Sequence, residues 1–164
     1  MNKRFFLELA NYNIWANNKM ISWLNGINDV QFKQSIESSF ESIAGLALHV
    51  ASAEKIWLER LHENPAPTWL ASGFKGDREA LIIIWKQASE NIKTYIENFD
   101  ENNLQHTVKF KRIDGEQFEL PFYQIFSHVL NHSTFHRGQF ITLLRQVGFT
   151  NISGTDLLDF HKSQ

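Results

Sequence analysis

Three histidines near the C-terminus, His128, His132 and His136, follow one another at intervals of four residues. In a helix that turns about 100° per residue, His132 and His136 lie within about 20° of Ile125, on a face otherwise made of apolar side chains. His128 lies about 60° away, at the edge of that face. Two imidazoles on adjacent turns stand about 5–6 Å apart, close enough to bind one metal ion. The pattern favours a metal site over a pair of hydrogen-bonded core histidines, which is the ordinary interpretation of a lone buried histidine.

A mononuclear site needs a third ligand, and His49 is the best candidate. It lies in another apolar-periodic segment, with Leu46, Ala53 and Ile56 at helical spacing around it. Three neutral imidazoles without a carboxylate suit Zn²⁺, Ni²⁺ or a similar divalent transition ion better than Mg²⁺ or Ca²⁺. Water or substrate would complete the coordination, and a water or thiol bound there would ionise more easily.

An enzyme would also need a group that transfers protons, and His128 and Glu54 are the candidate catalytic residues. Glu54 could equally pair with a basic residue or face solvent. A di-iron bundle is a weaker alternative, because it needs two Glu-x-x-His motifs and two further glutamates, and only Glu59 to His62 matches. Trp57, two turns after His49, belongs either to the core or to the wall of a cleft. The remaining histidines are expected at the surface: His62, His106 and His161.

Four segments with a helical apolar stripe would position these side chains. They cover about residues 2–25, 40–63, 77–99 and 121–147. Ser38 and Glu41 match a capping box at the start of the second segment, and Asp77 is a good N-cap for the third. Four amphipathic helices of similar length predict an all-α protein, a four-helix bundle.

The segments between and after the predicted helices contain sequence patterns of their own. In "TVKFKRIDGEQFEL", Asp114-Gly115 is typical of a type I′ turn, which predicts a small β-hairpin between the third and fourth helices, at the periphery. The link between the second and third helices has about a dozen residues, enough to cross one end of the bundle. In the tail, Thr155 and Asp156 could cap a last short turn that ends at Phe160.

Composition limits the possible functions. The 164 residues suggest one domain, 1–164, with 43% hydrophobic and 21% charged residues and a net charge of −2. Basic residues form no block or stripe, which argues against nucleic acid as a partner. The absence of cysteine excludes disulfides, thiolate nucleophiles and cysteine-type zinc sites. No apolar run is long enough for a membrane, and polar residues interrupt the signal-like opening early, so we expect a cytoplasmic protein.

Several stretches together resemble the DinB-like (damage-inducible) metalloprotein family. "NYNIWANNKM" is similar to the first-helix motif of the family, and "SFESIAGLALHVASAEKIWLERL" to the segment with its first metal histidine. "IDGEQFELPFYQIFSHVLNHSTFHRGQFITLLRQVG" resembles the hairpin and last helix, including a His-x-x-x-His-Arg-Gly-Gln signature, and "TDLLDF" the usual ending. The resemblance covers nearly the whole chain.

This resemblance implies an up-down-down-up four-helix bundle with one divalent ion bound by His49, His132 and His136. It places His128 where many members carry a histidine, as a residue that orients a ligand or a water. Members are often homodimers. The family name records induction by DNA damage in one lineage and does not imply DNA binding.

Three functions follow as alternatives. Some members are S-transferases or isomerases that use a low-molecular-weight thiol, such as glutathione, mycothiol or bacillithiol, which suggests a metal-dependent thiol S-transferase acting on a small molecule. A metal-dependent hydrolase would use the same site with water as the nucleophile. A non-catalytic, stress-related metal-binding protein is the third alternative.

Overall fold

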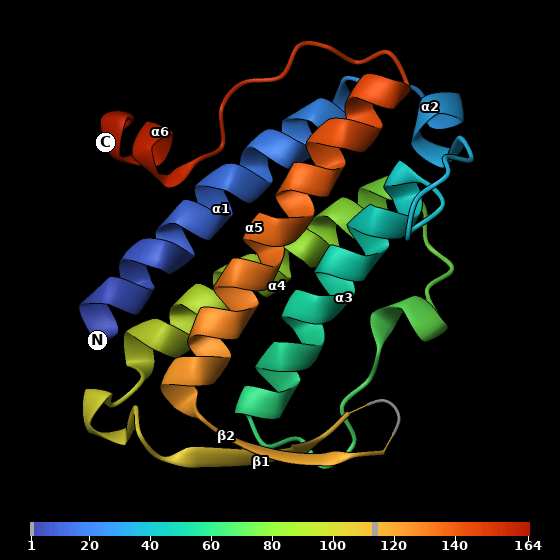
Figure 1. Ribbon diagram of the computed structural model, residues 1–164. Coiled ribbons are helices and arrows are strands. Elements are labelled where there is room, and N and C mark those ends of the chain that lie inside the picture. The colour runs from blue at the N-terminus through green and yellow to red at the C-terminus, as the bar shows by residue number, and fades with distance from the viewer. Residues whose placement is uncertain (1, 113–114) are drawn as a thin grey trace.

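Four long helices make up most of the molecule. The computed structural model describes residues 2–112 and 115–164, and the long helices are α1 (Lys3–Asn25), α3 (Ile43–Leu61), α4 (Arg78–Asn98) and α5 (Phe122–Gln146). Figure 1 shows α1 and α5 running in one direction along the bundle and α3 and α4 in the other. The predicted up-down-down-up four-helix bundle is therefore confirmed. No described helix combines the length and apolar character that a membrane span requires.

Shorter elements lie between and after the long helices. A two-stranded antiparallel sheet, β1 (Thr107–Lys111) with β2 (Gln117–Pro121), confirms the predicted hairpin, in the register Phe110 opposite Phe118. Asp114 of the predicted turn lies outside the described residues. The tail ends in α6 (Leu157–Lys162), capped by Asp156 as expected. The apolar patterns did not predict the remaining short helices: α2 (Asp29–Lys33), η1 (Leu70–Ser72) and η2 (Glu101–Asn103).

The second long helix starts later than the capping-box prediction placed it. Ser42, not Ser38, is the N-cap of α3, and its hydroxyl accepts a hydrogen bond of 3.0 Å from the Gly45 amide. Residues 36–42 instead form a tight loop in which the Ile36 amide donates to the Glu41 carbonyl over 2.8 Å. Glu41 has a φ of 59° in this loop, so it cannot belong to the first turn of a helix.

Among the described residues, the long helices enclose two large apolar clusters separated by a polar layer, and a third, small cluster lies between α1 and α6. One large cluster includes Met20, Leu46 and Trp85, and the other includes Phe6 and Phe126. Between them each long helix contributes buried polar side chains: Asn13, Asn17, Glu54, Ser89, Ser133 and Arg137. The layer crosses the middle of the bundle.

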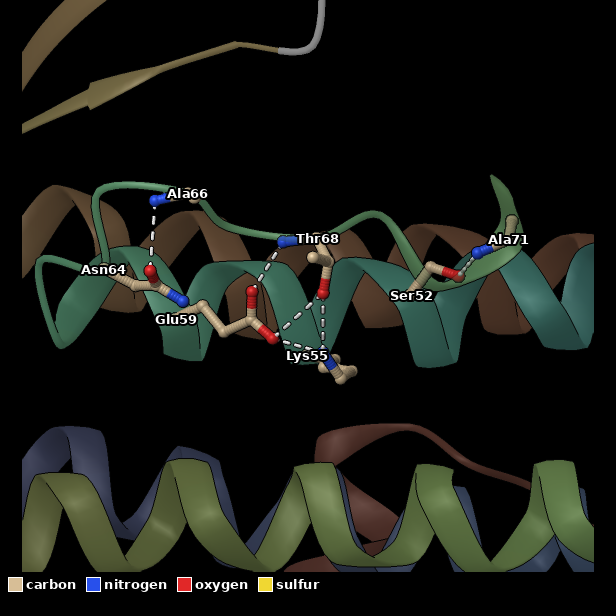
Figure 2. Close-up of polar contacts among 7 residues, drawn as sticks. All are labelled: Ser52, Lys55, Glu59, Asn64, Ala66, Thr68 and Ala71. Carbon is tan, nitrogen blue, oxygen red and sulfur yellow. Dashed lines mark hydrogen bonds and ion pairs between the residues drawn. The ribbon is translucent and has the colours of Figure 1, made fainter. Parts of the chain in front are cut away.

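The link between α3 and α4, residues 62–77, runs beside α3 and does not simply cross one end of the bundle. Since α3 and α4 point the same way, the chain must return the length of α3, about 28 Å at 1.5 Å per residue (Figure 1). Figure 2 shows how α3 holds it: the Ala71 amide donates to Ser52 Oγ (3.1 Å), and the Thr68 amide donates to Glu59 Oε2 (2.7 Å). Lys55 completes the contact by pairing with Glu59 and donating to Thr68 Oγ1 over 3.1 Å.

We predict that Ser52→Ala loosens this link without disturbing α3. The substitution leaves the Ala71 amide without its acceptor, so the free energy of opening at that amide should fall by about 1 kcal/mol. Hydrogen exchange followed by NMR would measure this. Ser127→Ala is the matched control, because the Ser127 hydroxyl donates to a carbonyl four residues earlier, as Ser52 does, without binding a loop. Equal exchange at Ala71 in wild type and Ser52→Ala would contradict the prediction.

Candidate metal centre

Three histidine nitrogens converge between α3 and α5. His49 lies in α3, and His132 and His136 lie one turn apart in α5. The Nε2 atom of His49 is 3.3 Å from that of His132 and 3.1 Å from that of His136, and the last two are 3.0 Å apart. The three predicted ligands therefore come together, and they could hold a metal ion.

The geometry of the three nitrogens fits one face of a coordination polyhedron. With metal–nitrogen bonds of about 2.0–2.1 Å, neighbouring ligands are about 3.3 Å apart in a tetrahedron and about 2.9 Å apart in an octahedron. The observed separations of 3.0–3.3 Å fall in this range. The remaining coordination positions would point away from the triangle, as an open catalytic site requires.

Hydrogen bonding and burial keep the three imidazoles ready to coordinate. His136 Nδ1 is 2.6 Å from Gln139 Oε1, so Nδ1 donates and the Nε2 lone pair faces the other two rings. Burial, with a contribution from His136, lowers the pKa of His49 to about 4. Burial and the neighbouring histidines lower the pKa of His132 to about 3. Burial lowers the pKa of His136 as well, against the effect of Gln139. At neutral pH all three are in the uncharged form that binds metal.

Aromatic rings enclose the histidines. The Phe40 ring lies 4.6 Å from the His49 ring and 5.3 Å from that of His136, between ring centroids, and Trp69 lies 5.6 Å from His49. Phe40 can take this position because residue 45 is a glycine. A Cβ at Gly45 would lie 2.2 Å from the Phe40 carbonyl oxygen. Trp69 is placed by the link that α3 holds. Helical spacing did not predict these contacts, because both rings belong to irregular segments that fold back on α3.

A cavity of about 880 Å³ opens beside the histidines. The hairpin, expected at the periphery, forms part of its wall through Phe110, Phe118 and Leu120. The helices and the link supply the other apolar side chains, and most of the exposed lining surface is apolar. In all, the cavity is lined by His49, Ala53, Ile56, Trp57, Arg60, Trp69, Phe110, Arg112, Phe118, Leu120, Gln124, His128 and His132. Two of the three converging histidines, His49 and His132, thus border an apolar space of ligand size.

His128, one of the two candidate catalytic residues, lies in the cavity wall. Its ring is 5.7 Å from that of His132 and 4.8 Å from that of Trp57. Burial and then the charge of Arg60 lower the pKa of His128, so it is neutral at pH 7. It does not belong to the group of three converging nitrogens. This position agrees with a residue beside the metal centre rather than a ligand.

Glu54, the other candidate, lies in the polar layer and is not among the described residues that line the cavity. It is fully buried, and its carboxylate accepts hydrogen bonds from side chains of the other three long helices. Asn13 Nδ2 and Asn17 Nδ2 donate over 2.9 Å each, Ser133 Oγ over 2.8 Å, and Ser89 Oγ over 2.5 Å. The structure therefore gives Glu54 a well-satisfied position inside the bundle.

Arg137 is the buried cation of the same layer. Its side chain is 3% exposed, and Nη1 donates to Asn13 Oδ1 (2.7 Å) and Asn17 Oδ1 (3.3 Å). Burial lowers the pKa of Arg137, whereas Tyr12 and Glu54 raise it. The two asparagines thus bridge a buried carboxylate and a buried guanidinium. This bridge gives a physical reason for the asparagines in "NYNIWANN" and for the arginine that follows His136.

We predict that Glu54→Gln destabilises the protein by on the order of 3 kcal/mol. The glutamine amide would turn an N–H group toward donors, and Arg137 would lose the nearby negative charge. Chemical denaturation would measure the free energy of unfolding. Glu90→Gln is the control, because Glu90 is exposed on α4. A loss of activity in Glu54→Gln at unchanged stability would contradict this and favour a catalytic role.

We further predict that the wild-type chain binds one Zn²⁺ and that His132→Ala weakens its affinity by more than about a hundredfold. Removing a ligand should cost more than removing an outer hydrogen-bond partner, which typically costs about 10- to 100-fold. Native mass spectrometry with added zinc gives the stoichiometry, and competition with a chelator gives the affinity. His106→Ala is the control, because His106 is exposed and outside the cluster. Undiminished zinc binding by His132→Ala would refute the site.

Known proteins resemble this chain in sequence and in fold. Protein DinB of Bacillus subtilis (strain 168) is 25% identical over 154 residues, which cover 90% of this chain and 88% of that protein. A DinB-like crystal structure from Bacillus subtilis (YjoA) has a TM-score of 0.67 at 15% identity, covering 90% of this chain and 96% of that one. One from Bacillus cereus ATCC 10987 has a TM-score of 0.65 at 18% identity, covering 91% and 95%. These two structures share the fold.

The family assignment rests on a match along the full length. The DinB family model matches residues 1–164, which include all four long helices, the hairpin and the three converging histidines. The resemblance seen in the motifs is therefore confirmed. The chain belongs to the DinB family.

Proposed function

We propose that this protein is a metal-dependent enzyme that joins a low-molecular-weight thiol to a small electrophile. The observation that carries the proposal is the triangle of Nε2 atoms from His49, His132 and His136 beside an apolar cavity of about 880 Å³. A purely structural site would be closed by a fourth protein ligand, and among the described residues no further histidine or carboxylate joins these three. The donor set suits Zn²⁺ or Ni²⁺.

The residues around the centre would have different roles in such a reaction. The three histidines would hold the ion, and an ion held there would lower the pKa of a thiol or water bound to it, so that a nucleophile forms at neutral pH. His128, neutral at pH 7 and in the cavity wall, would accept the proton released by the thiol. The sulfur then forms a bond to the electrophilic carbon, and the leaving group departs with the electrons of the bond that breaks. Phe40 and Trp69 would limit the access of water to His49.

A hydrolase is the second candidate, and the position of His128 favours it equally. A neutral imidazole beside the centre could take a proton from water as readily as from a thiol. We assign proton transfer to His128 rather than to Glu54, because Glu54 is satisfied by four hydrogen bonds inside the bundle.

The expected homodimer and the expected cytoplasmic location of the protein stay predictions.

Activity measurements can separate these functions. We predict that the zinc-loaded protein consumes at least one thiol from a panel of glutathione, cysteine, bacillithiol and mycothiol in the presence of aryl halide and epoxide electrophiles. His132→Ala should reduce the rate to the protein-free background, and His128→Gln should lower it about 10²- to 10⁴-fold, the usual contribution of a positioned acid or base. Loss of free thiol and formation of the thioether, followed by mass spectrometry, provide the readout.

His106→Gln, at an exposed position away from the cluster, is the control and should retain full activity. Hydrolysis of esters or amides that depends on His132, without thiol consumption, would replace the proposal with the hydrolase. Zinc binding without either activity in these panels would contradict both enzymatic candidates and leave the non-catalytic metal-binding function.

A further inference from the structure

Arg60, in the last turn of α3, is a buried cation without a carboxylate partner among the described residues. Its residue surface is 7% exposed, and it borders the cavity. Nη2 donates one hydrogen bond of 3.2 Å to the Lys111 carbonyl, and the buried Nε atom has no hydrogen-bond partner in residues 2–112 and 115–164. Buried guanidinium groups are normally paired or fully hydrogen-bonded, because removing the charge from water is costly. Arg60 therefore retains hydrogen-bonding capacity that this part of the chain does not use.

The surroundings of Arg60 are aromatic. Its guanidinium carbon lies 4.5 Å from the centroid of the Trp57 ring and 5.1 Å from that of Phe110. These rings contact the guanidinium group without neutralising its charge. Burial, and then the positive charge of Arg112, lower the pKa of Arg60, but a guanidinium remains protonated in proteins. Arg112 differs from Arg60 because it has an acidic partner, Glu116, at 3.5 Å.

Arg60 and the three-histidine centre lie at two separate places on the cavity wall. His49, Ala53, Trp57 and Arg60 follow one another at steps of three and four residues, which line one face of α3. From His49 to Arg60 the helix rises about 16 Å. The side chains between them are apolar. A molecule that occupied the cavity could place one group at the metal centre, an apolar body along α3 and an anionic group at Arg60.

We propose that Arg60 binds the carboxylate of the small molecule that occupies this cavity, and so selects acidic substrates or co-substrates. The inference rests on the proposed function in one respect, because it takes the cavity as the substrate-binding space. Arg112 also borders the cavity but is paired with Glu116, so Arg60 is the guanidinium with donors to spare, and it matches the two oxygens and single charge of a carboxylate. A doubly charged phosphate would call for further cations or a cluster of backbone amides.

Calorimetric titration with three probes tests the proposal. Phenylbutyrate carries a carboxylate on an apolar body, phenylbutyramide is its neutral counterpart, and phenylpropyl phosphate replaces the carboxylate with a phosphate. Zinc-loaded wild type should bind phenylbutyrate more tightly than either of the other probes. Arg60→Met, which keeps an apolar side chain against Trp57, should weaken phenylbutyrate binding about 10- to 100-fold and leave phenylbutyramide binding unchanged.

Arg145→Met is the matched control, because it removes the same charge from an exposed position at the end of α5. Arg60→Gln is the second variant; it keeps a donor for the Lys111 carbonyl and should show the same loss if Arg60→Met is poorly folded. Equal affinity of wild type for the acid and the amide, or equal phenylbutyrate affinity in wild type and both Arg60 variants, would overturn the proposal. Tighter binding of the phosphate would overturn the assignment to a carboxylate.

The same titrations on zinc-free protein separate this inference from the proposed function. A carboxylate bound by Arg60 should bind in the absence of zinc, with the same dependence on Arg60. Phenylbutyrate that bound only through the metal would lose its affinity without zinc and keep it in Arg60→Met, which contradicts the proposal. Failure of the thiol-transfer experiment would leave the result at Arg60 unaffected.

Discussion

The carboxylate of Glu54 ties the four long helices together at one level. It belongs to α3, and its four hydrogen bonds come from α1, α4 and α5. A buried carboxylate without these donors would be very costly, so the helices can pack only in the register that brings the donors to it. Ser133, one of the donors, lies next to His132 in α5, and His49 lies in the same helix as Glu54. The hydrogen bonds that satisfy Glu54 therefore also set where the three histidines meet.

Two groups of buried polar side chains lie close together in this bundle and differ in how they are satisfied. In the polar layer, the Glu54 carboxylate and Nη1 of Arg137 find their partners within the protein, through Asn13 and Asn17, and Arg137 Nε alone has no hydrogen-bond partner among the described residues of this layer. The three Nε2 atoms of the histidine cluster face one another, and because each neutral Nε2 carries either a proton or a lone pair, at least one of the three contacts joins two like groups. An ion would satisfy all three lone pairs. The hydrogen-bonded polar layer makes the bundle rigid, whereas the histidine cluster could bind an ion from solution.

Local spacing made part of the site predictable from the sequence. The four-residue interval between His132 and His136 fixes a shared helical face, and the apolar stripes located all four long helices. Features of the site that depend on contacts between residues far apart in the sequence could not be predicted from local spacing. Glu54 looked like a catalytic or surface carboxylate because its donors lie 35 to 79 residues away along the chain. Arg60 likewise carried no signal, because its lack of a partner emerges only when the hairpin packs against α3.

The parallel course of α3 and α4 has a consequence for how this fold can diversify. A link that must return along α3 places Trp69 at the cavity, and none of its residues belongs to the buried polar layer (Figure 1). Substitutions, insertions or deletions in that link can reshape the ligand space and leave both the polar layer and the histidines in place. The hairpin, a separate segment between α4 and α5, contributes Phe110 and Phe118 to the wall and offers the same freedom. The bundle thus separates a frame that carries the three histidines from two walls built by other segments, an arrangement in which specificity can change without the fold having to change with it.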